Sequence, residues 1–313
     1  MNRRLFLKRG ACMSAAAVLA GCGKAPVMQS DTHTQAASTQ SALKKPLVGT
    51  HIWVYAKHQP NYDVSNILPK IWADVQYAGI DAVELMEQPL RREDKTNEIA
   101  ALIDQHNVAL IGTSYGANFW NSADTNKIYE DLDNISQNLQ TLNARTLGIS
   151  VGRAPEGRLK TDSEFDVQAD LIRRLVKLTD ERGIVLNLHN HTYEVENDLH
   201  DLSGTLSRIP SVKLGPDLNW LKRAGIDPIW FLKSFKDNIV FMHLRDEYKN
   251  GSWSESLGEG DVDFEAIANT LSDIAYTGDI IIELAHEDGF TPTRPIKESL
   301  RMSRAMVRQK FKV

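Results

Sequence analysis

Short apolar runs alternate with amphipathic stretches from Pro46 to the end of the 313-residue chain. The runs are rich in Val, Ile and Leu and have the length of strands, whereas the stretches between them repeat apolar residues at helical spacing, as at Leu171, Ile172 and Leu175. We therefore predict strands at 46–53, 80–86, 108–114, 145–151, 184–190, 211–217, 238–244 and 279–284. The predicted helices lie at 63–78, 92–106, 124–142, 163–182, 195–208, 221–236, 263–276 and 291–309. Gly79, Gly183 and Gly278 each precede a strand, where we expect left-handed residues that end the helices.

Eight strands that alternate with eight helices predict an α/β fold, a single (β/α)8 TIM barrel. The alternative is a doubly wound open sheet, which typically carries a Gly-rich turn after its first strand. The corresponding segment here, VGTHIWVYAKH, has no such turn. Polar residues also follow nearly every predicted strand, and in a closed barrel all strands end on the same rim. This pattern favours the barrel.

Acids and imidazoles stand at the ends of four strands in the last third of the chain. IVLNLHNHTYE ends at Glu194, KLGPD ends at Asp217, FMHLRD contains His243 and IIIELAHE contains Glu283. Two of them have an alternative structural explanation: Asp217 could cap a helix, and a strand histidine such as His243 is often only hydrogen-bonded in the core. An unpaired carboxylate within an apolar strand, such as Glu283, is costly unless it is paired or protonated. Convergence of all four on one rim predicts a divalent-metal site.

The N-terminus has the composition of an export signal. Arg3 and Arg4 belong to the segment NRRLFLK, which resembles a twin-arginine leader, and the apolar run that follows is too short to span a membrane. LAGC ends at Cys22 and resembles a lipoprotein processing box, with uncleaved or lipid-free processing as the alternatives. We expect a signal peptide at 1–21, a protein exported to the periplasmic side, and a membrane anchor through lipidated Cys22.

The segment 22–45 is polar and rich in Ser, Thr, Gln and Ala, which predicts a flexible tether before a barrel at 46–313. The formal net charge is -5, and removal of the four positive charges of residues 1–21 leaves about -9. An acidic chain is a poor match for nucleic acid, because binding to it depends on neutralising phosphates with Lys and Arg. We therefore expect no nucleic-acid partner.

Four motifs together resemble the xylose isomerase-like TIM barrels, the sugar phosphate isomerase/epimerase superfamily. They are LHNHTYE, KLGPDLNWLKRAG, MHLRDE followed by LGEGDVDF, and IIELAHE. Their order and spacing match over roughly residues 46–310. The resemblance implies a metal-dependent enzyme that acts on a carbohydrate substrate, and members of this kind often carry an exported leader.

The resemblance also implies roles for individual residues. The metal ligands would be Glu194, Asp217, His243 and Glu283, and Glu283 would also transfer a proton. Most relatives have Glu where this chain has His189, so the fourth ligand is either His189 or Glu194, and we favour Glu194. The candidate catalytic residues are Glu283, Glu194, His189 and His191. The candidate substrate-binding residues at other strand ends are His51, Trp53, Glu84 and Arg245.

A ligand set of mostly oxygen atoms with one imidazole suits Mn²⁺ or Mg²⁺, and Co²⁺ or Zn²⁺ can also enter such a site. We expect a sugar isomerase or epimerase that removes an α-proton through an enediolate. One alternative is a lyase or hydratase that acts on 3-keto-glycosides with the same site. Another is a carbohydrate-binding lipoprotein without catalysis, although such a protein has no need of a buried carboxylate such as Glu283.

Overall fold

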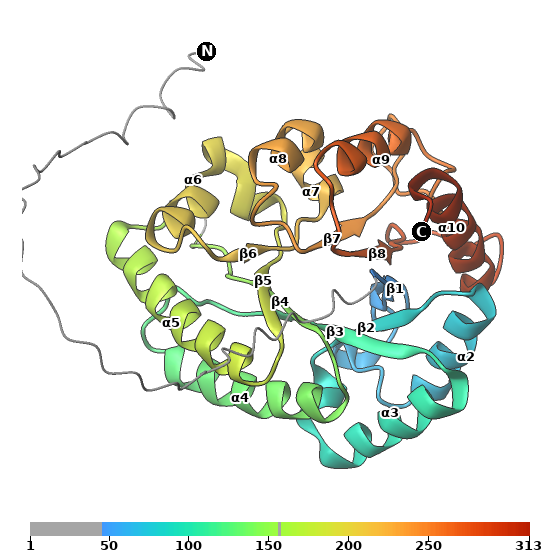
Figure 1. Cartoon of the computed structure of the whole chain (residues 1–313), viewed down its shortest axis with the longest axis horizontal. Coiled ribbons are helices and arrows are strands. Elements are labelled where there is room, and N and C mark those ends of the chain that lie inside the picture. Colours follow the sequence, from blue (N-terminus) through green and yellow to red (C-terminus); the bar gives the residue numbers. More distant parts are fainter. Residues whose placement is uncertain (1–45, 156–157) are drawn as a thin grey trace, which may run out of the picture. The chain divides into compact units, whose positions relative to one another are not determined.

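The computed structural model describes residues 46–155 and 158–313, which form eight strands surrounded by helices (Figure 1). The predicted signal peptide, Cys22 and the tether lie outside the described residues. The strands are β1 Val48–His51, β2 Ala82–Met86, β3 Ala109–Gly116, β4 Thr146–Ser150, β5 Val185–Leu188, β6 Lys213–Leu214, β7 Phe241–Leu244 and β8 Asp279–Glu283. The helices are α1 Trp53–Ala56, α2 Leu68–Ala78, α3 Glu93–His106, α4 Thr125–Thr141, α5 Asp162–Glu181, α6 Thr192–Arg208, α7 Leu218–Arg223, α8 Pro228–Ser234, α9 Phe264–Asp273 and α10 Ile296–Phe311, with short 3-10 turns η1 Pro60–Tyr62 and η2 Gln88–Arg91.

The eight strands form one parallel sheet in the order β6-β5-β4-β3-β2-β1-β8-β7. Its two edges meet through single parallel bridges, from Leu214 to Ile239 and from Asp217 to His243. The sheet is thereby a nearly closed barrel. The predicted TIM barrel is confirmed, and each predicted strand overlaps an observed one, with β3 extending two residues beyond the prediction.

Strand register places the polar strand ends in one layer of the barrel. His51 pairs with Glu84 on β2 and with Glu283 on β8, and Asp217 pairs with His243 across the closing edge. Parallel strands present the same ends to the same rim, so these residues converge although they are far apart in sequence.

An apolar layer lies directly below this polar layer. Ala82, Ile111, Phe241 and Ile281 form a separate buried cluster. Ala82, Phe241 and Ile281 precede Glu84, His243 and Glu283 by two positions, and residues two apart on a strand point to the same side. The barrel interior is therefore filled with apolar side chains up to the level of the site.

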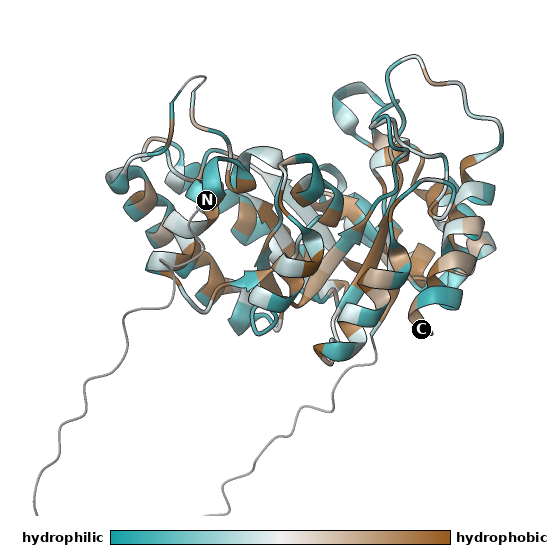
Figure 2. Cartoon of the chain, turned by 90° about the horizontal axis from the view of Figure 1, so that it is seen from above, coloured by the Kyte–Doolittle hydropathy of each residue, from teal (hydrophilic) through white to brown (hydrophobic). Residues whose placement is uncertain are grey.

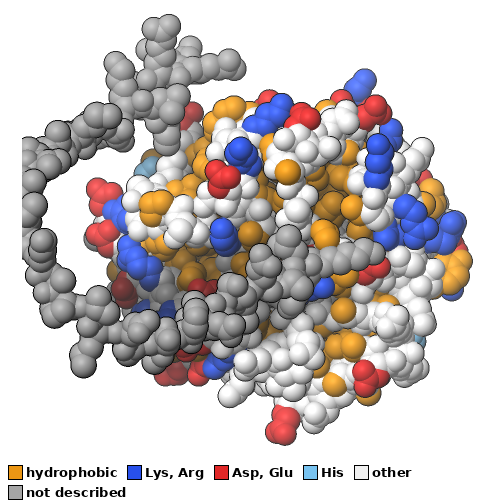
Figure 3. All heavy atoms as spheres, viewed as in Figure 1, with side chains coloured by type: hydrophobic (Ala, Val, Ile, Leu, Met, Phe, Trp, Pro, Cys, Tyr) orange, Lys and Arg blue, Asp and Glu red, His pale blue; other side chains and the backbone are white. Residues whose placement is uncertain are grey.

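A larger core lies between the sheet and the helices, where the apolar stripes of the helices face the strands. Figure 2 shows apolar residues along the strands and polar residues on the exposed parts of the helices. Figure 3 shows one face of the molecule, on which Lys and Arg side chains are interspersed with Asp and Glu. Within the described residues, no helix is long and apolar enough to cross a membrane.

The predicted helix at 221–236 is wrong, because the chain forms two helices there. Gly225 adopts a left-handed φ of 78° after α7, and the Asp227 side chain accepts a hydrogen bond from the Ile229 amide at the start of α8. Pro228 occupies the first turn of α8, a position where its missing N–H costs nothing. These three residues end one helix and begin the next.

Two of the three predicted left-handed glycines are confirmed. Gly79 has a φ of 69° and Gly183 a φ of 72°. The prediction for Gly278 is wrong: the left-handed residue after α9 is Ala275, with a φ of 52°. Gly278 is instead close to the neighbouring strand, since a Cβ there would lie 2.3 Å from the carbonyl oxygen of Val240.

Candidate active site

A cavity of about 640 Å³ opens at the carboxyl ends of the strands. Its floor contains His51, His189, His243 and Glu283, which are nearly or fully buried at 9% exposure or less. The volume falls within the range of about 300–1,000 Å³ that is typical of ligand pockets, and its position is that of active sites in TIM barrels.

His243 lies between two buried carboxylates. Its Nε2 is 2.7 Å from Oε2 of Glu84, and its Nδ1 is 2.7 Å from Oε2 of Glu283. The second contact lacks hydrogen-bond geometry, so His243 Nδ1 and Glu283 Oε2 have no hydrogen-bond partner among the described residues. Burial alone would lower the pKa of His243, but the two carboxylates outweigh it and raise the pKa to about 10. Without a metal ion, His243 therefore carries a proton at neutral pH.

Arg245 links two of the predicted ligands. Its Nε donates to Oδ2 of Asp217 at 2.6 Å, and its Nη2 donates to Oε1 of Glu283. Burial raises the pKa of Glu283, but Arg245 and the protonated His243 outweigh it and hold the pKa well below its usual value. Glu283 is therefore an ionised carboxylate that faces the cavity.

His51 is neutral in this arrangement. The Trp53 amide donates to His51 Nδ1 at 3.1 Å, so Nε2 carries the proton and donates to the Ser114 hydroxyl at 2.9 Å. Burial lowers the pKa of His51 despite the nearby Glu283 and Glu84. The 3.3 Å approach of Nδ1 to Glu283 is consequently a contact and not an ion pair.

Three side chains are placed to hold a metal ion. His189, Asp217 and His243 each offer a ligand atom, and these atoms lie within 4.8 Å of one another. His189 Nδ1 is buried and finds no hydrogen-bond partner in the part of the chain that the structure describes. Burial is the largest cause that lowers the pKa of His189 well below its ordinary value. A neutral imidazole with a free nitrogen beside a carboxylate fits a divalent transition metal. Glu283 lies outside this three-residue group, although its Oε2 is 2.7 Å from His243 Nδ1.

Asp217 also caps a helix, as its alternative explanation required. Its Oδ1 accepts from the amides of Asn219 and Trp220 at the start of α7. Its Oδ2 accepts from Arg245. The capping bonds fix the carboxylate on the rim, so capping and metal binding are compatible here.

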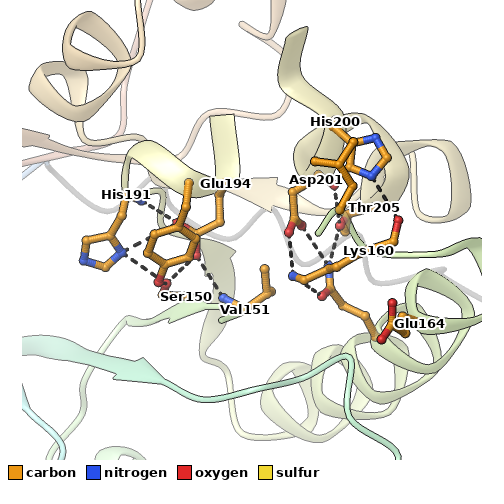
Figure 4. A network of polar contacts seen from close by, with 12 residues as sticks. Ser150, Val151, Lys160, Glu164, His191, Glu194, His200, Asp201 and Thr205 are labelled. Atoms are coloured by element: carbon orange, nitrogen blue, oxygen red, sulfur yellow. Dashed lines mark hydrogen bonds and ion pairs between the residues drawn. The ribbon is translucent and has the colours of Figure 1, made fainter. Parts of the chain in front are cut away.

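Glu194 lies outside the three-residue group. Figure 4 shows its carboxylate bonded to the Ser150 hydroxyl, to the amide of Val151 at 3.2 Å and to the amide of His191 at 2.6 Å. The last bond is part of the capping of α6, which begins directly after His191. Both oxygens of Glu194 are thus engaged with the chain itself.

Next to Glu194, Figure 4 shows a second buried network. Lys160 Nζ lies 2.5 Å from Asp201 Oδ2 and donates to Gln168 at 2.8 Å. Burial is the largest cause that lowers the pKa of Lys160 and raises that of Asp201. Separating such a pair would leave one charge buried without a partner, which costs free energy. The network therefore holds the start of α5 against α6.

The predicted substrate-binding residues differ in position. His51, Trp53 and Arg245 line the cavity, whereas Glu84 does not and is only 1% exposed beneath His243. His191 lines the cavity at the β5 side. Burial lowers the pKa of His191, but Glu194, whose Oε2 lies 3.6 Å from its Nδ1, outweighs it and raises the pKa.

Sequence reasoning did not single out several residues that line the cavity. Ser114 ends the third predicted strand, so the pattern of polar residues at strand ends predicts a place for it at the cavity. Trp220 lies three residues after Asp217 within a motif that was already of interest. Tyr62 and Trp253 lie in connecting segments, and no periodicity in the sequence marks them.

The family model of the xylose isomerase-like TIM barrel matches residues 72–306. The chain belongs to this family. Similar solved structures include the D-allulose 3-epimerase of Methylomonas sp. in complex with D-allulose, which is 16% identical with a TM-score of 0.69 and aligns over 85% of this chain and 97% of that one. The 3-keto-D-glucoside 4-epimerase of E. coli is 15% identical with a TM-score of 0.66, over 85% of this chain and all of the other. Both likenesses concern the fold.

One relative among curated proteins is the inosose dehydratase of Bacillus thuringiensis (strain Al Hakam), 25% identical over 175 residues. The match covers 48% of this chain and 56% of the dehydratase, so the chain spans about half the length of that relative. The similar proteins named here are thus two sugar epimerases and a dehydratase.

Proposed function

We propose that the protein is a metal-dependent isomerase or epimerase that removes the α-proton of a sugar or keto-sugar. The observation that carries this proposal is the convergence of His189, Asp217 and His243 beside the ionised Glu283 at the base of an open cavity. The sugar epimerases and isomerases among the proteins of similar fold support it.

Glu283 is the proposed proton acceptor. Arg245 keeps it ionised. No described residue forms a hydrogen bond with its Oε2, so a lone pair is available to a proton on the substrate. General base catalysis of this kind contributes about 10²–10⁴-fold to a rate.

His191 is the proposed proton donor on the opposite side. Glu194 raises the pKa of His191, while Arg245 and His243 lower that of Glu283, so the two shifts favour a protonated imidazole and an ionised carboxylate. Return of a proton from the β5 side would give epimerisation, and return from Glu283 would give isomerisation. His189 lies next to His191, with ring centroids 5.1 Å apart, and would orient it at the edge of the cavity.

Asp217, His243 and His189 would hold the metal ion, with Glu283 as the fourth ligand. When bound, the ion would act as a Lewis acid on the carbonyl oxygen of the sugar. With His189 in place of Glu194, the set has two imidazoles, which shifts the preference from Mg²⁺ towards Mn²⁺, Co²⁺ or Zn²⁺. His189 thus takes the place of Glu194 as a metal ligand in our proposal, and Glu194 fixes the position of His191 through its hydrogen bond to the His191 amide.

A lyase is the second candidate, and the similarity to inosose dehydratase favours it. The same two groups would serve it, since Glu283 would take the α-proton and His191 would protonate a leaving hydroxyl or alkoxide on the neighbouring carbon. The difference between the two reactions lies in whether the substrate carries a leaving group at that carbon.

Incubation with keto-sugars and 3-keto-glycosides in D2O, followed by NMR, tests both candidates. We expect metal-dependent deuterium at the carbon next to the carbonyl, with a new stereoisomer or positional isomer for an isomerase or epimerase and loss of water or an aglycone for a lyase. No exchange into any compound by the metal-loaded protein would contradict both.

We also propose that residues 1–21 export the protein and that Cys22 anchors it in a membrane on the periplasmic side. The support is the sequence LAGC after a twin-arginine segment. Two or more acyl chains on one protein are sufficient for stable anchoring. Mass spectrometry of the mature N-terminus should find acylated Cys22, and a mature chain with unmodified or absent Cys22 would contradict the proposal.

A further inference from the structure

Aromatic side chains flank the polar centre of the cavity on two sides. Beyond the ends of β6 and β7, the Trp220 ring centroid lies 6.0 Å from that of His191 and 5.5 Å from that of Trp253. From the β1 side, Trp53 contacts Tyr62 at 5.3 Å, with the two ring planes 31° apart. All four aromatic residues other than the histidine belong to the cavity wall.

The two aromatic pairs differ in what covers them. The guanidinium carbon of Arg223 lies 3.6 Å from the centre of the Trp253 ring, and that of Arg245 lies 5.3 Å from the centre of the Trp220 ring. Cations therefore already stack on the pair of Trp220 and Trp253. Within the described part of the chain, no Lys or Arg is stacked on Trp53 or Tyr62.

Tyr62 is held in the cavity wall by an unusual backbone. It has a φ of 58° and follows Asn61 with a φ of 54°. Asn tolerates this left-handed conformation, but a bulky residue such as Tyr rarely adopts it. The Tyr62 side chain is nevertheless 48% exposed, so burial of an aromatic ring in the core does not account for the strain. Strained residues of this kind cluster where a ligand is held.

Charged groups stand at the same end of the cavity. Lys57 follows Trp53 on the C-terminal side of α1, and its Nζ lies 2.9 Å from the carboxylate of Asp288, which is fully exposed. Both residues line the cavity. An aromatic face with hydrogen-bonding groups at its edge suits a sugar ring, whose C–H groups form an apolar face and whose hydroxyls point outward from its edge.

We propose that Trp53 and Tyr62 form a second carbohydrate subsite, which binds the non-reacting ring of a two-ring glycoside while the reacting ring lies over Glu283. The inference rests on the proposed carbohydrate chemistry of the cavity. The cavity of about 640 Å³ has Trp53 and Tyr62 as well as Glu283 in its wall, so it extends beyond the polar centre where the reacting ring would lie.

Calorimetric binding of non-reacting probes to the full-length protein tests the subsite. The probes are cellobiose, maltose and trehalose, each compared with methyl glucoside. We expect at least one disaccharide to bind about 10-fold more tightly than methyl glucoside, a difference of about 1.4 kcal/mol. Tyr62→Ala should remove most of this preference and leave the affinity for methyl glucoside unchanged.

Two variants serve as controls. Tyr62→Phe keeps the ring and should keep the preference for the disaccharide. Tyr77→Ala removes a tyrosine of similar exposure, 50%, on α2, where it does not line the cavity, and should bind all probes as the wild type does. No preference for any disaccharide in the wild type, or the same affinities in Tyr62→Ala as in the wild type, would overturn the subsite.

The binding assay requires no turnover, so its failure is distinct from failure of the proposed function. Metal-dependent exchange without an effect of Tyr62→Ala on binding would remove the subsite alone. A disaccharide preference that depends on Tyr62 in a protein without exchange activity would support the subsite and remove the proposed reaction.

Discussion

His243 Nε2 lies 2.7 Å from Oε2 of Glu84, and both side chains are almost completely buried. A histidine that binds metal commonly donates its other ring N–H to a carboxylate, which fixes the tautomer and the ring orientation. With Nε2 turned to Glu84, the nitrogen that remains for a metal is Nδ1, which faces Glu283. Glu84 therefore acts through His243 in our account, and not through the substrate.

Glu84→Gln should weaken metal binding by about 10- to 100-fold, because the neutral amide orients His243 less firmly and no longer stabilises its partial charge. A competition titration against a metal-binding dye measures the affinity. Glu87→Gln is the matched control, since Glu87 lines the cavity beside Arg91 but does not contact His243. Equal affinities for the wild type and Glu84→Gln would contradict this role.

His189→Ala and Glu194→Ala should separate the two candidates for the fourth protein ligand. We expect His189→Ala to lose most of its metal, because His189 belongs to the group of ligand atoms within 4.8 Å. Glu194→Ala should keep its metal but unfold at lower urea concentration, since three hydrogen bonds to Ser150, Val151 and His191 are lost. Elemental analysis and urea unfolding provide the measurements. The reverse pattern of metal loss would restore Glu194 as the ligand.

The metal-free protein should lose stability as the pH rises. The pKa of His243 is raised from 6.5 to about 10 in the folded protein, so its contribution to the free energy of unfolding is complete below about pH 6.5 and is lost as the pH passes through 10. Urea unfolding in the presence of a chelator should show this decline in the wild type and a weaker one in His243→Asn. Identical pH dependence in the two proteins would refute the assigned proton.

The polar ends of the strands could be predicted from sequence, because the spacing of apolar residues and the position where an apolar run ends are local properties of the chain. Asp217, His243 and Glu283 each stand where an apolar run stops, and parallel strands bring such positions to one rim. The same reasoning predicted the eight strands, whose ends the sequence placed within a few residues.

The partners of these residues could not be predicted, because they depend on side-chain direction. Glu194 lies beyond the end of β5, in the first turn of α6, where its carboxylate reaches back to the His191 amide. Arg245 follows His243 by two positions and therefore points to the same barrel interior. Its hydrogen bonds to Asp217 and Glu283 join the ends of three strands, which come together only when the barrel closes. The strained turn at Tyr62 likewise has no periodic signal in the sequence.

The exchange of substrate protons with solvent tests the central claim most directly. Glu283→Gln keeps the shape of the side chain and one ligating oxygen but removes the base, whereas Glu287→Gln changes an exposed acid in the wall of the same cavity. With metal added to saturation, deuterium incorporation from D2O into a sugar that the wild type turns over should fall by at least about 10²-fold in Glu283→Gln and stay at the wild-type rate in Glu287→Gln. Exchange at the wild-type rate by metal-loaded Glu283→Gln would show that Glu283 is not the base.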